Sequence, residues 1–239
     1  MNVYEVGSLS EKLSTNAYPG RGIVLGVSPD GKNAIAAYFI MGRSVNSRNR
    51  IFALEPDGIR TEAHDPSLMK DPHLIIYHPV REVGCGLIVT NGDQTDTVRD
   101  GLQEGNTFAD ALRTREFEPD APNFTPRISG ILHTEDGKMS YKLSILKKSP
   151  YCNGCDRFFY EYEIPADGVG HIIHTYMADG NPIPSFCGEP VSFGVGTDLK
   201  SIADGVWGAL NDDNKVSLFA RSVSLEDGEI ETLIYNKNQ

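Results

Sequence analysis

Seven consecutive polar residues and glycine, residues 91–97, have the composition of a ligand-binding turn. They read Asn-Gly-Asp-Gln-Thr-Asp-Thr and follow residues 84–90, an apolar run that predicts a buried strand. The residues that come next, 98–103, have helical character. At a strand-to-helix junction, backbone N–H groups and short polar side chains are free to bind a polar ligand. We therefore predict that residues 91–97 line a ligand pocket.

A second candidate is the segment 31–54, which contains no acidic residue although acids outnumber bases in the chain. Its basic residues and the asparagines between them are Lys32, Arg43, Asn46, Arg48, Asn49 and Arg50. A guanidinium group presents a planar set of donors that suits phosphate, and an asparagine adds a donor beside it. The alternative is a solvated loop whose arginines pair with surface acids, and composition alone favours that alternative.

Two further segments place polar groups at strand ends. Residues 117–127 contain three prolines and lead into a strand, and a stiff loop in such a position commonly holds ligand-facing groups. Tyr77 and His78 end another predicted strand, where a phenol or an imidazole can transfer a proton. Each segment has a structural alternative, because prolines also terminate helices and a single Tyr or His is more often structural.

The four cysteines do not form a disulfide framework. Cys152 and Cys155 form a single C-x-x-C, to which Cys187 and one of His171 and His174 would add zinc ligands. A strong zinc pattern repeats the cysteine pair, so a reduced turn is the favoured interpretation and we expect no metal. The sequence has no P-loop, no dinucleotide-binding glycine motif at a strand-to-helix junction and no G-x-S-x-G elbow.

The overall charge limits the partners of the chain. A formal net charge of -11 argues against nucleic acid or an anionic membrane as the main partner, because either would repel the surface. A local cluster of arginines can still bind a small anion. No apolar stretch approaches the length of a membrane span, and the first six residues lack the pattern of a signal peptide. We therefore expect a cytoplasmic protein with a small-molecule ligand.

A fold rich in strands must position these groups. Turn signals and apolar runs predict strands at 22–27, 34–41, 51–54, 74–77, 86–90, 128–133, 139–146, 158–164, 171–177, 216–223 and 230–235. Helical spacing predicts one region at 95–115, divided at Gly105 and Asn106, and another at 197–210. We expect residues 1–17 to form an irregular N-terminal extension and residues 18–239 a single domain. This element order predicts an α+β domain of sheets covered by helices.

Five blocks of residues, taken together and in this order, resemble the archaeal-type IMP cyclohydrolase family. The blocks are Tyr18-Pro19-Gly20-Arg21, Arg43-Ser44 with Asn49-Arg50, Asp71 to Tyr77, Asn91-Gly92 with Thr95-Asp96-Thr97, and Glu118 with Asn123 and Thr125-Pro126-Arg127. The resemblance implies a four-layer αββα sandwich similar to that of N-terminal-nucleophile hydrolases. Position 2 is Asn, so the nucleophile of those hydrolases is not evident, which suits a family that lacks it.

The resemblance also implies a reaction, the closure of 5-formamidoimidazole-4-carboxamide ribotide to IMP with loss of water, the last step of de novo purine synthesis. The carboxamide nitrogen attacks the formyl carbon of the same molecule, so much of the catalysis consists of holding a reactive conformation. No metal or organic cofactor is needed, because no redox change occurs. We expect the enzyme to be a homo-oligomer.

By similarity to the family, Tyr77 and Glu118 are the proton-transfer and orienting pair. Arg50 corresponds to an active-site arginine that either polarises the formyl oxygen or binds the 5'-phosphate. The residues expected to bind substrate are Arg21, Arg43, Asn49, Asn91, Gly92, Thr95, Asp96 and Arg127. Because its aspartates repel phosphate, the segment 91–97 is expected to contact the ribose or the base. Arginines from elsewhere in the chain are expected to bind the phosphate at the other end of the pocket.

The chain departs from the family pattern between Arg43 and Arg50, where two extra residues would let Arg48 replace either arginine. Two other functions are compatible with the residues. An amide hydrolase on the same fold would require cleavage to a new N-terminal Cys, Ser or Thr. A non-catalytic nucleotide-binding protein would keep the arginines and the Asn-Gly turn without the catalysis.

Overall fold

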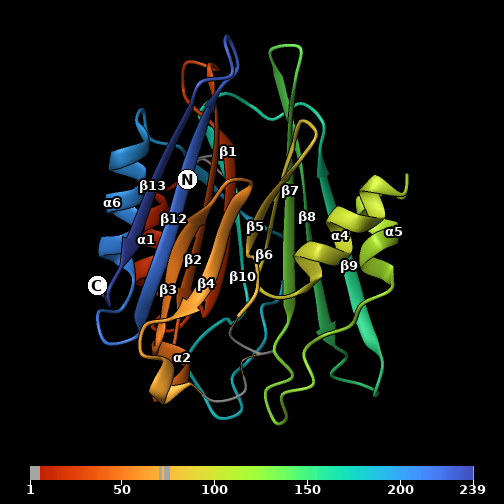
Figure 1. Ribbon diagram of the computed structural model, residues 1–239, viewed down its shortest axis with the longest axis vertical. Coiled ribbons are helices and arrows are strands. Elements are labelled where there is room, and N and C mark those ends of the chain that lie inside the picture. The colour runs from red at the N-terminus through yellow and green to blue at the C-terminus, as the bar shows by residue number, and fades with distance from the viewer. Residues whose placement is uncertain (1–5, 70–71, 73–75, 239) are drawn as a thin grey trace.

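The computed structural model describes residues 6–69, 72 and 76–238. Two antiparallel sheets form its centre (Figure 1). The first sheet contains, in spatial order, β11 (Val191–Gly194), β10 (Val169–His174), β1 (Arg21–Val27), β2 (Asn33–Met41), β12 (Lys215–Ser224) and β13 (Ile230–Asn236). The second contains β3 (Arg50–Glu55), β4 (Gly58–Ala63), β5 (Val80–Val83), β6 (Gly86–Thr90), β7 (Arg127–Glu135), β8 (Lys138–Lys148) and β9 (Cys155–Tyr162).

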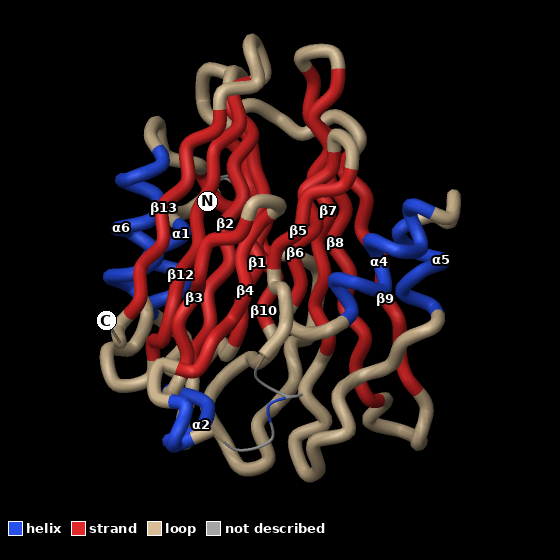
Figure 2. The backbone as a smooth tube through the Cα atoms, viewed as in Figure 1, coloured by secondary structure: helices blue, strands red, loops and turns tan. Residues whose placement is uncertain are grey.

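Helices cover the outer faces of both sheets (Figure 2). The first sheet is covered by α6 (Leu199–Ala209) and α1 (Leu9–Ser14), and the second by α4 (Gln94–Gln103) and α5 (Phe108–Arg113). Two short elements, α2 (Val45–Arg48) and the 3-10 turn η1 (Pro66–Leu68), lie in connections. The α+β class and the layered arrangement of helices and sheets are confirmed. The more specific likeness to N-terminal-nucleophile hydrolases stays a prediction.

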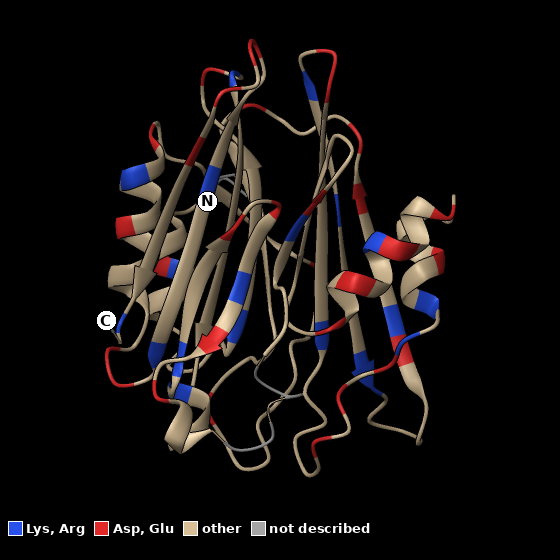
Figure 3. Cartoon of the chain, in the orientation of Figure 1, with Lys and Arg blue, Asp and Glu red and all other residues tan. Residues whose placement is uncertain are grey.

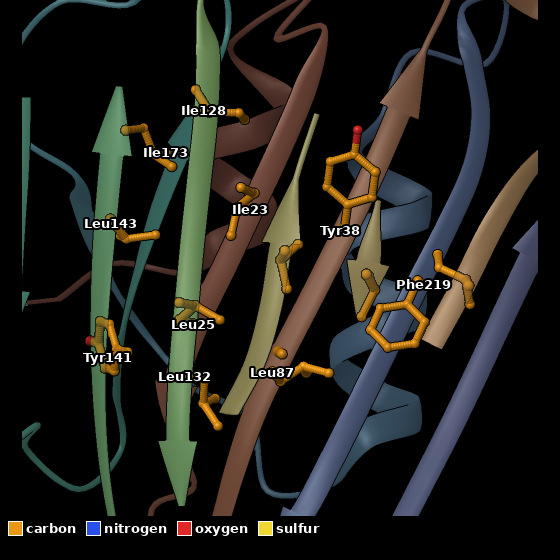
Figure 4. Close-up of a cluster of buried hydrophobic side chains, with 14 of the residues drawn as sticks. Ile23, Leu25, Tyr38, Leu87, Ile128, Leu132, Tyr141, Leu143, Ile173 and Phe219 are labelled. Atoms are coloured by element: carbon orange, nitrogen blue, oxygen red, sulfur yellow. The ribbon is translucent and has the colours of Figure 1, made fainter. Parts of the chain in front are cut away.

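The main hydrophobic core lies between the sheets (Figure 4). Ile23 and Leu25 of β1 point into it, whereas Val24 of the same strand packs in the second core beneath α6. Both faces of β1 and β2 are therefore covered, which explains why these strands are continuous apolar runs. Charged side chains are sparse along these central strands and concentrate on helices, turns and outer strands (Figure 3).

Several predicted elements differ from those observed. The strands β4, β5 and β11 were not expected, because they are short or polar and form by pairing with their neighbours. Residues 74 and 75 of the predicted strand 74–77 lie outside the described residues. Ile76 and Tyr77 belong to the loop before β5, so the strand prediction is wrong for them. The two predicted helical regions are confirmed as α4 with α5 and as α6.

The N-terminal segment is more ordered than predicted. Residues 1–5 lie outside the described residues, but Leu9–Ser14 form α1 instead of an irregular extension. Leu9 and Leu13, four residues apart on one face of this helix, are buried in the core beneath α6. No helix among the described residues is both long and apolar enough to span a bilayer.

Candidate active site

A cavity of about 310 Å³ opens near α2, at the bottom of Figure 1. Its lining comes from the turn before β1, the segment between β2 and β3, the loop from α5 to β7, and the segment after β10. These segments are distant in sequence, and they meet because strands of both sheets begin or end at this edge of the sandwich. Of the eleven predicted site residues, Arg21, Arg43, Arg50 and Glu118 line the cavity itself.

Three arginines line the cavity, and two of them, Arg21 and Arg50, lie in its inner part. Arg50, the first residue of β3, is fully buried, and its Nε donates to the carbonyl of Ser47 at 2.9 Å. Its Nη1 has no hydrogen-bond partner among the described residues, nor has Nε of Arg21, the first residue of β1. Neither arginine forms an ion pair with a described carboxylate. Burial, followed by the charge of Arg21, lowers the pKa of Arg50. An anion bound between the two guanidinium groups would offset both the cost of burying the charge of Arg50 and its repulsion by Arg21.

Two tyrosines lie beside the arginines. The hydroxyl groups of Tyr77 and Tyr38 are 2.9 Å apart, and both side chains are buried. The backbone N–H of Tyr77 donates to Oγ1 of Thr61 on β4, which anchors the loop before β5. Burial, with the nearby Tyr77, raises the pKa of Tyr38, while the charges of Arg21 and Arg50 oppose the rise. Sequence reasoning missed Tyr38, because it lies in an apolar strand and resembles a core residue.

Glu118 is the carboxyl group of the cavity. The exposed fraction of the whole residue is 9%, and its backbone N–H donates to the carbonyl of Thr125 at 2.9 Å, which closes the proline-rich loop. Burial raises the pKa of Glu118, and the charges of Arg21 and Arg127 oppose this rise. A carboxyl group held in this way can both accept and release a proton closer to neutral pH than an exposed glutamate.

An aromatic wall completes the cavity. The rings of Tyr18 and Tyr176 are stacked with their centroids 5.8 Å apart, and the hydroxyl of Tyr176 is 2.6 Å from Oγ1 of Thr125. Asp120 accepts hydrogen bonds from the backbone and the side chain of Thr125. The sequence did not lead us to assign these four residues to the site. Tyr18 and Thr125 nevertheless belong to blocks that resemble the family, and Asp120 lies in the proline-rich segment 117–127. Tyr176 reaches this wall just beyond the pairing of β10 with β1, where its backbone N–H donates to the carbonyl of Pro19 at 3.2 Å.

The polar turn 91–97, which was predicted to line a ligand pocket, lies behind the cavity lining. The side-chain amide of Asn91 donates to the carbonyl of Pro126 at 2.8 Å and accepts from the backbone N–H of Ile128 at 2.9 Å. The hydroxyl groups of Thr95 and Thr90 are 2.6 Å apart in the interior. Asn91 and Thr95 therefore hold the start of β7 and the first turn of α4 in place, next to the site.

Gly92 and Arg127 connect that turn to the cavity. A Cβ atom on Gly92 would lie 2.6 Å from Nη1 of Arg127, so glycine leaves room for the guanidinium group. The Nη1 atom of Arg127 is 2.7 Å from Oδ1 of Asp93 and 3.9 Å from Oε1 of Glu118. Arg127 is thus placed beside the carboxyl group of the cavity.

The remaining predicted residues occupy different positions. Arg43 lines the cavity, is ion-paired with Asp179, and lies over the ring of Tyr18 at 5.1 Å. Asn49 holds η1 through its amide, which donates to the carbonyl of Asp65 at 2.7 Å.

Asp96 and Arg48 belong to other parts of the molecule. Asp96 pairs with Arg81 and Arg99, at 2.9 Å and 3.0 Å, on the side where α4 meets β5. Arg48 donates to the carbonyl of Gly42 at 2.9 Å and does not line the cavity, which leaves Arg50 in that position.

The cysteine and histidine residues that suggested zinc do not gather. Cys152, Cys155 and Cys187 are free thiols, and His171 is hydrogen-bonded to the hydroxyl of Tyr141 at 2.6 Å. Within the described ranges, no group of three His, Cys, Asp or Glu residues is arranged to hold a metal ion.

The chain is thus a two-sheet α+β sandwich with a cavity lined by arginines and tyrosines at one edge. Residues 18–228 match the family described as IMP cyclohydrolase-like protein, and the chain belongs to that family. The resemblance drawn from the five blocks is thereby confirmed.

Relatives named IMP cyclohydrolase are similar over part of their length. The one from Methanosphaera stadtmanae is 32% identical over 123 residues, which is 49% of this chain and 59% of the relative. One from Methanococcus maripaludis (strain C7) is 35% identical over 132 residues, 52% of this chain and 62% of the relative. One from Methanopyrus kandleri is 31% identical over 163 residues, which is 66% of this chain and 75% of the relative. The chain thus spans about three fifths of the length of the first two relatives.

Proposed function

We propose that this protein is an IMP cyclohydrolase, which closes 5-formamidoimidazole-4-carboxamide ribotide to IMP with loss of water in the cytoplasm. The observation that carries the proposal is the fully buried Arg50 with the half-buried Arg21, neither ion-paired with a carboxylate in the described part of the chain, beside Tyr77 and Glu118. Positive charge that the protein leaves unpaired suits an anionic ribotide. Family membership and the names of the relatives add support.

The atoms of the reaction balance without a cofactor. The carboxamide nitrogen forms a bond to the formyl carbon, the double bond from that carbon to the formyl oxygen breaks, and the bond from that carbon to the formamido nitrogen becomes double. One proton from the carboxamide nitrogen and one from the formamido nitrogen leave with this oxygen as water. The tasks of the enzyme are therefore to hold the two groups together, to move protons and to stabilise charge on the formyl oxygen.

Residues that line the cavity, together with Tyr77 behind Arg50, divide these tasks. Glu118, whose burial raises its pKa, takes the proton from the carboxamide nitrogen, and Tyr77 donates to the departing oxygen. Arg50 lies beside Tyr77 and stabilises negative charge on the formyl oxygen. Arg43, at the partly exposed mouth, exchanges Asp179 for the 5'-phosphate, and Arg21 adds positive charge near Glu118.

The other predicted residues are proposed to support the pocket. Asn91, Gly92 and Thr95 hold the turn behind Glu118, and Asn49 holds the segment that carries Arg50. Arg127 acts on the charge of Glu118. Asp96 is far enough from the lining that we assign it to the ion pairs of α4.

The proposal is tested by following conversion of the formamido ribotide to IMP in the ultraviolet. We expect turnover by the wild type and a loss of kcat of about 100-fold or more in Tyr77→Phe and in Glu118→Gln. Tyr235→Phe and Glu161→Gln, which change the same residue types on the outer strands, serve as matched controls and should keep full activity. IMP binding without turnover in the wild type would instead favour the non-catalytic nucleotide-binding function.

A further inference from the structure

Gln94, the first residue of α4, is a fully buried polar side chain that the proposed reaction does not use. Its Nε2 donates to Oδ1 of Asn91 at 2.9 Å and to the carbonyl of Ile128 at 3.2 Å. Its Oε1 accepts a hydrogen bond from Nη1 of Arg127 at 2.6 Å. Because both donors of the amide are occupied by fixed acceptors, its oxygen is directed toward Arg127.

The guanidinium group at the end of this chain of contacts faces Glu118. Nη1 of Arg127, which Gln94 holds, is the atom 3.9 Å from Oε1 of Glu118. Both side chains are largely buried, with exposed fractions of 11% and 12%. At such a distance and burial, the position of the guanidinium group strongly affects the protonation of the carboxyl group.

We infer that Gln94 is a positioning residue, which fixes Arg127 against Glu118 without neutralising its charge. The inference rests on the proposed role of Glu118 in the cyclohydrolase reaction. A neutral acceptor matters here because a buried carboxylate in the same place would pair with the guanidinium group and cancel its effect on Glu118. The other acceptor, Asp93, is more than half exposed and is shared with Arg115, so water and a second cation weaken its hold.

The charged groups around Glu118 determine the direction of the expected effect. Arg21 from β1 and Arg127 from β7 lower its pKa, whereas Asp120 from its own loop and Asp93 from the turn before α4 raise it. Burial already holds the pKa of Glu118 above its usual value. Displacing Arg127 therefore raises this pKa further, whether Glu118 acts as the acid or as the base.

The test is the pH dependence of kcat/KM in Gln94→Met, which keeps the volume but removes both the acceptor and the donors. In the pH profile of kcat/KM, we expect the limb that reports the titration of Glu118 to move to higher pH by about one unit. The reason is that an opposite charge at this distance shifts the pKa of a carboxyl group by about one to three units. Gly92→Ala, whose Cβ would lie 2.6 Å from Nη1 of Arg127 and 2.7 Å from Oε1 of Gln94, disturbs the same contact and should move the limb of the pH profile in the same direction.

A matched control separates positioning from general destabilisation. Thr107→Ala removes the N-cap of α5 in the same helical layer, so it should lower the unfolding temperature without moving the limb. An unchanged limb in folded Gln94→Met and Gly92→Ala, or an equal shift in Thr107→Ala, would overturn the inference.

A second measurement does not depend on turnover. The carboxyl carbon of Glu118 is titrated by NMR in the full-length protein, with its signal identified by its loss in Glu118→Gln. The pH at the midpoint of this titration should rise in Gln94→Met, and an unchanged midpoint would refute the positioning role. If the wild type fails to convert the ribotide but the midpoint still rises, the proposed reaction is wrong and the contact between Gln94 and Arg127 retains its role.

Discussion

Arg50 illustrates how single residues of this site favour binding over stability. It is fully buried, and its charge is opposed by that of Arg21 instead of being balanced by a carboxylate. Burying an unpaired charge costs several kcal/mol, and replacing such a group by an apolar one of similar volume is often stabilising. The protein keeps this cost at the place where we propose that the substrate carries negative charge.

This argument predicts opposite effects of one substitution on stability and catalysis. In Arg50→Met the buried charge is removed, so the ligand-free protein should be more stable by about 1 kcal/mol or more. The same variant should lose kcat for the formamido ribotide, because negative charge on the formyl oxygen is no longer stabilised. Thermal unfolding and the ultraviolet assay measure the two effects. A less stable variant with unchanged kcat would show that Arg50 has a structural role.

At the scale of elements, the strands at the open edges of the two sheets are joined by side chains. The amide of Asn236, at the end of β13, accepts from the backbone N–H of Phe52 on β3 at 2.8 Å. It also donates to the carbonyl of Phe52 at 3.1 Å, as a neighbouring strand would. Ser217 of β12 donates to the same amide oxygen at 2.7 Å. The amide of Asn236 thus connects β13, the edge strand of the first sheet, to β3, the edge strand of the second. The contact on β3 lies two residues after Arg50.

Replacing this amide should loosen the sandwich. Asn236→Ala leaves the backbone groups of Phe52 without partners, and we expect the free energy of unfolding to fall by about 1 to 3 kcal/mol. Asn238→Ala is the matched control, because that half-buried side chain makes one hydrogen bond, to the carbonyl of Arg48, and should change stability by less than about 0.5 kcal/mol. Denaturant unfolding compares the two variants, and equal losses would contradict the special role of Asn236.

Elements also show what the amino-acid pattern could predict. The strands β1 and β2 and the helix α6 were predicted because each buries enough apolar residues to leave a local pattern. The strands β4, β5 and β11 leave no such pattern, since their pairing is determined by partners elsewhere in the chain. The helix α1 was missed because its apolar face consists of Leu9 and Leu13 within a polar segment.

On the scale of the whole molecule, histidines on β10 make the sandwich sensitive to acid. Burial lowers the pKa of His174 to about 4, although its Nδ1 contacts the backbone carbonyl of Tyr176 at 2.9 Å. Burial also lowers the pKa of His171, whose Nδ1 contacts the hydroxyl of Tyr141 on the opposite sheet at 2.6 Å. Both groups are therefore neutral in the folded protein at a pH where the unfolded chain binds a proton.

The direction of the pH effect follows from these shifts. The unfolded histidine has a pKa of about 6.5, so the stability contributed by neutral His174 is complete above that pH. It is lost as the pH falls from about 6.5 toward about 4, the pKa of the folded state. We expect His174→Gln to lose less stability than the wild type over this range. Unfolding by denaturant at several pH values measures the difference, and parallel curves would contradict the assignment.

A further expectation at this scale is self-association, because we expect the protein to be a homo-oligomer. Sedimentation of the full-length protein tests it directly. A mass equal to 26.2 kDa would show a monomer and would contradict the expectation.

The sequence alone was enough to determine the family, the α+β class and four of the residues that line the cavity. Arg21, Arg43, Arg50 and Glu118 occur in short blocks whose residue types and order are visible without a structure. Strands and helices with continuous apolar faces were predicted for a similar reason, since burial leaves a pattern within a few neighbouring residues.

Only the tertiary structure decided which polar groups face the cavity and which support it. It placed Arg50 in the cavity in preference to Arg48, and brought the hydroxyl of Tyr38 to that of Tyr77. It also turned Asn91 toward β7, so that the polar turn supports the pocket from behind. These contacts join residues from different strands and both sheets. They depend on strand order and register, which no local pattern of residues contains.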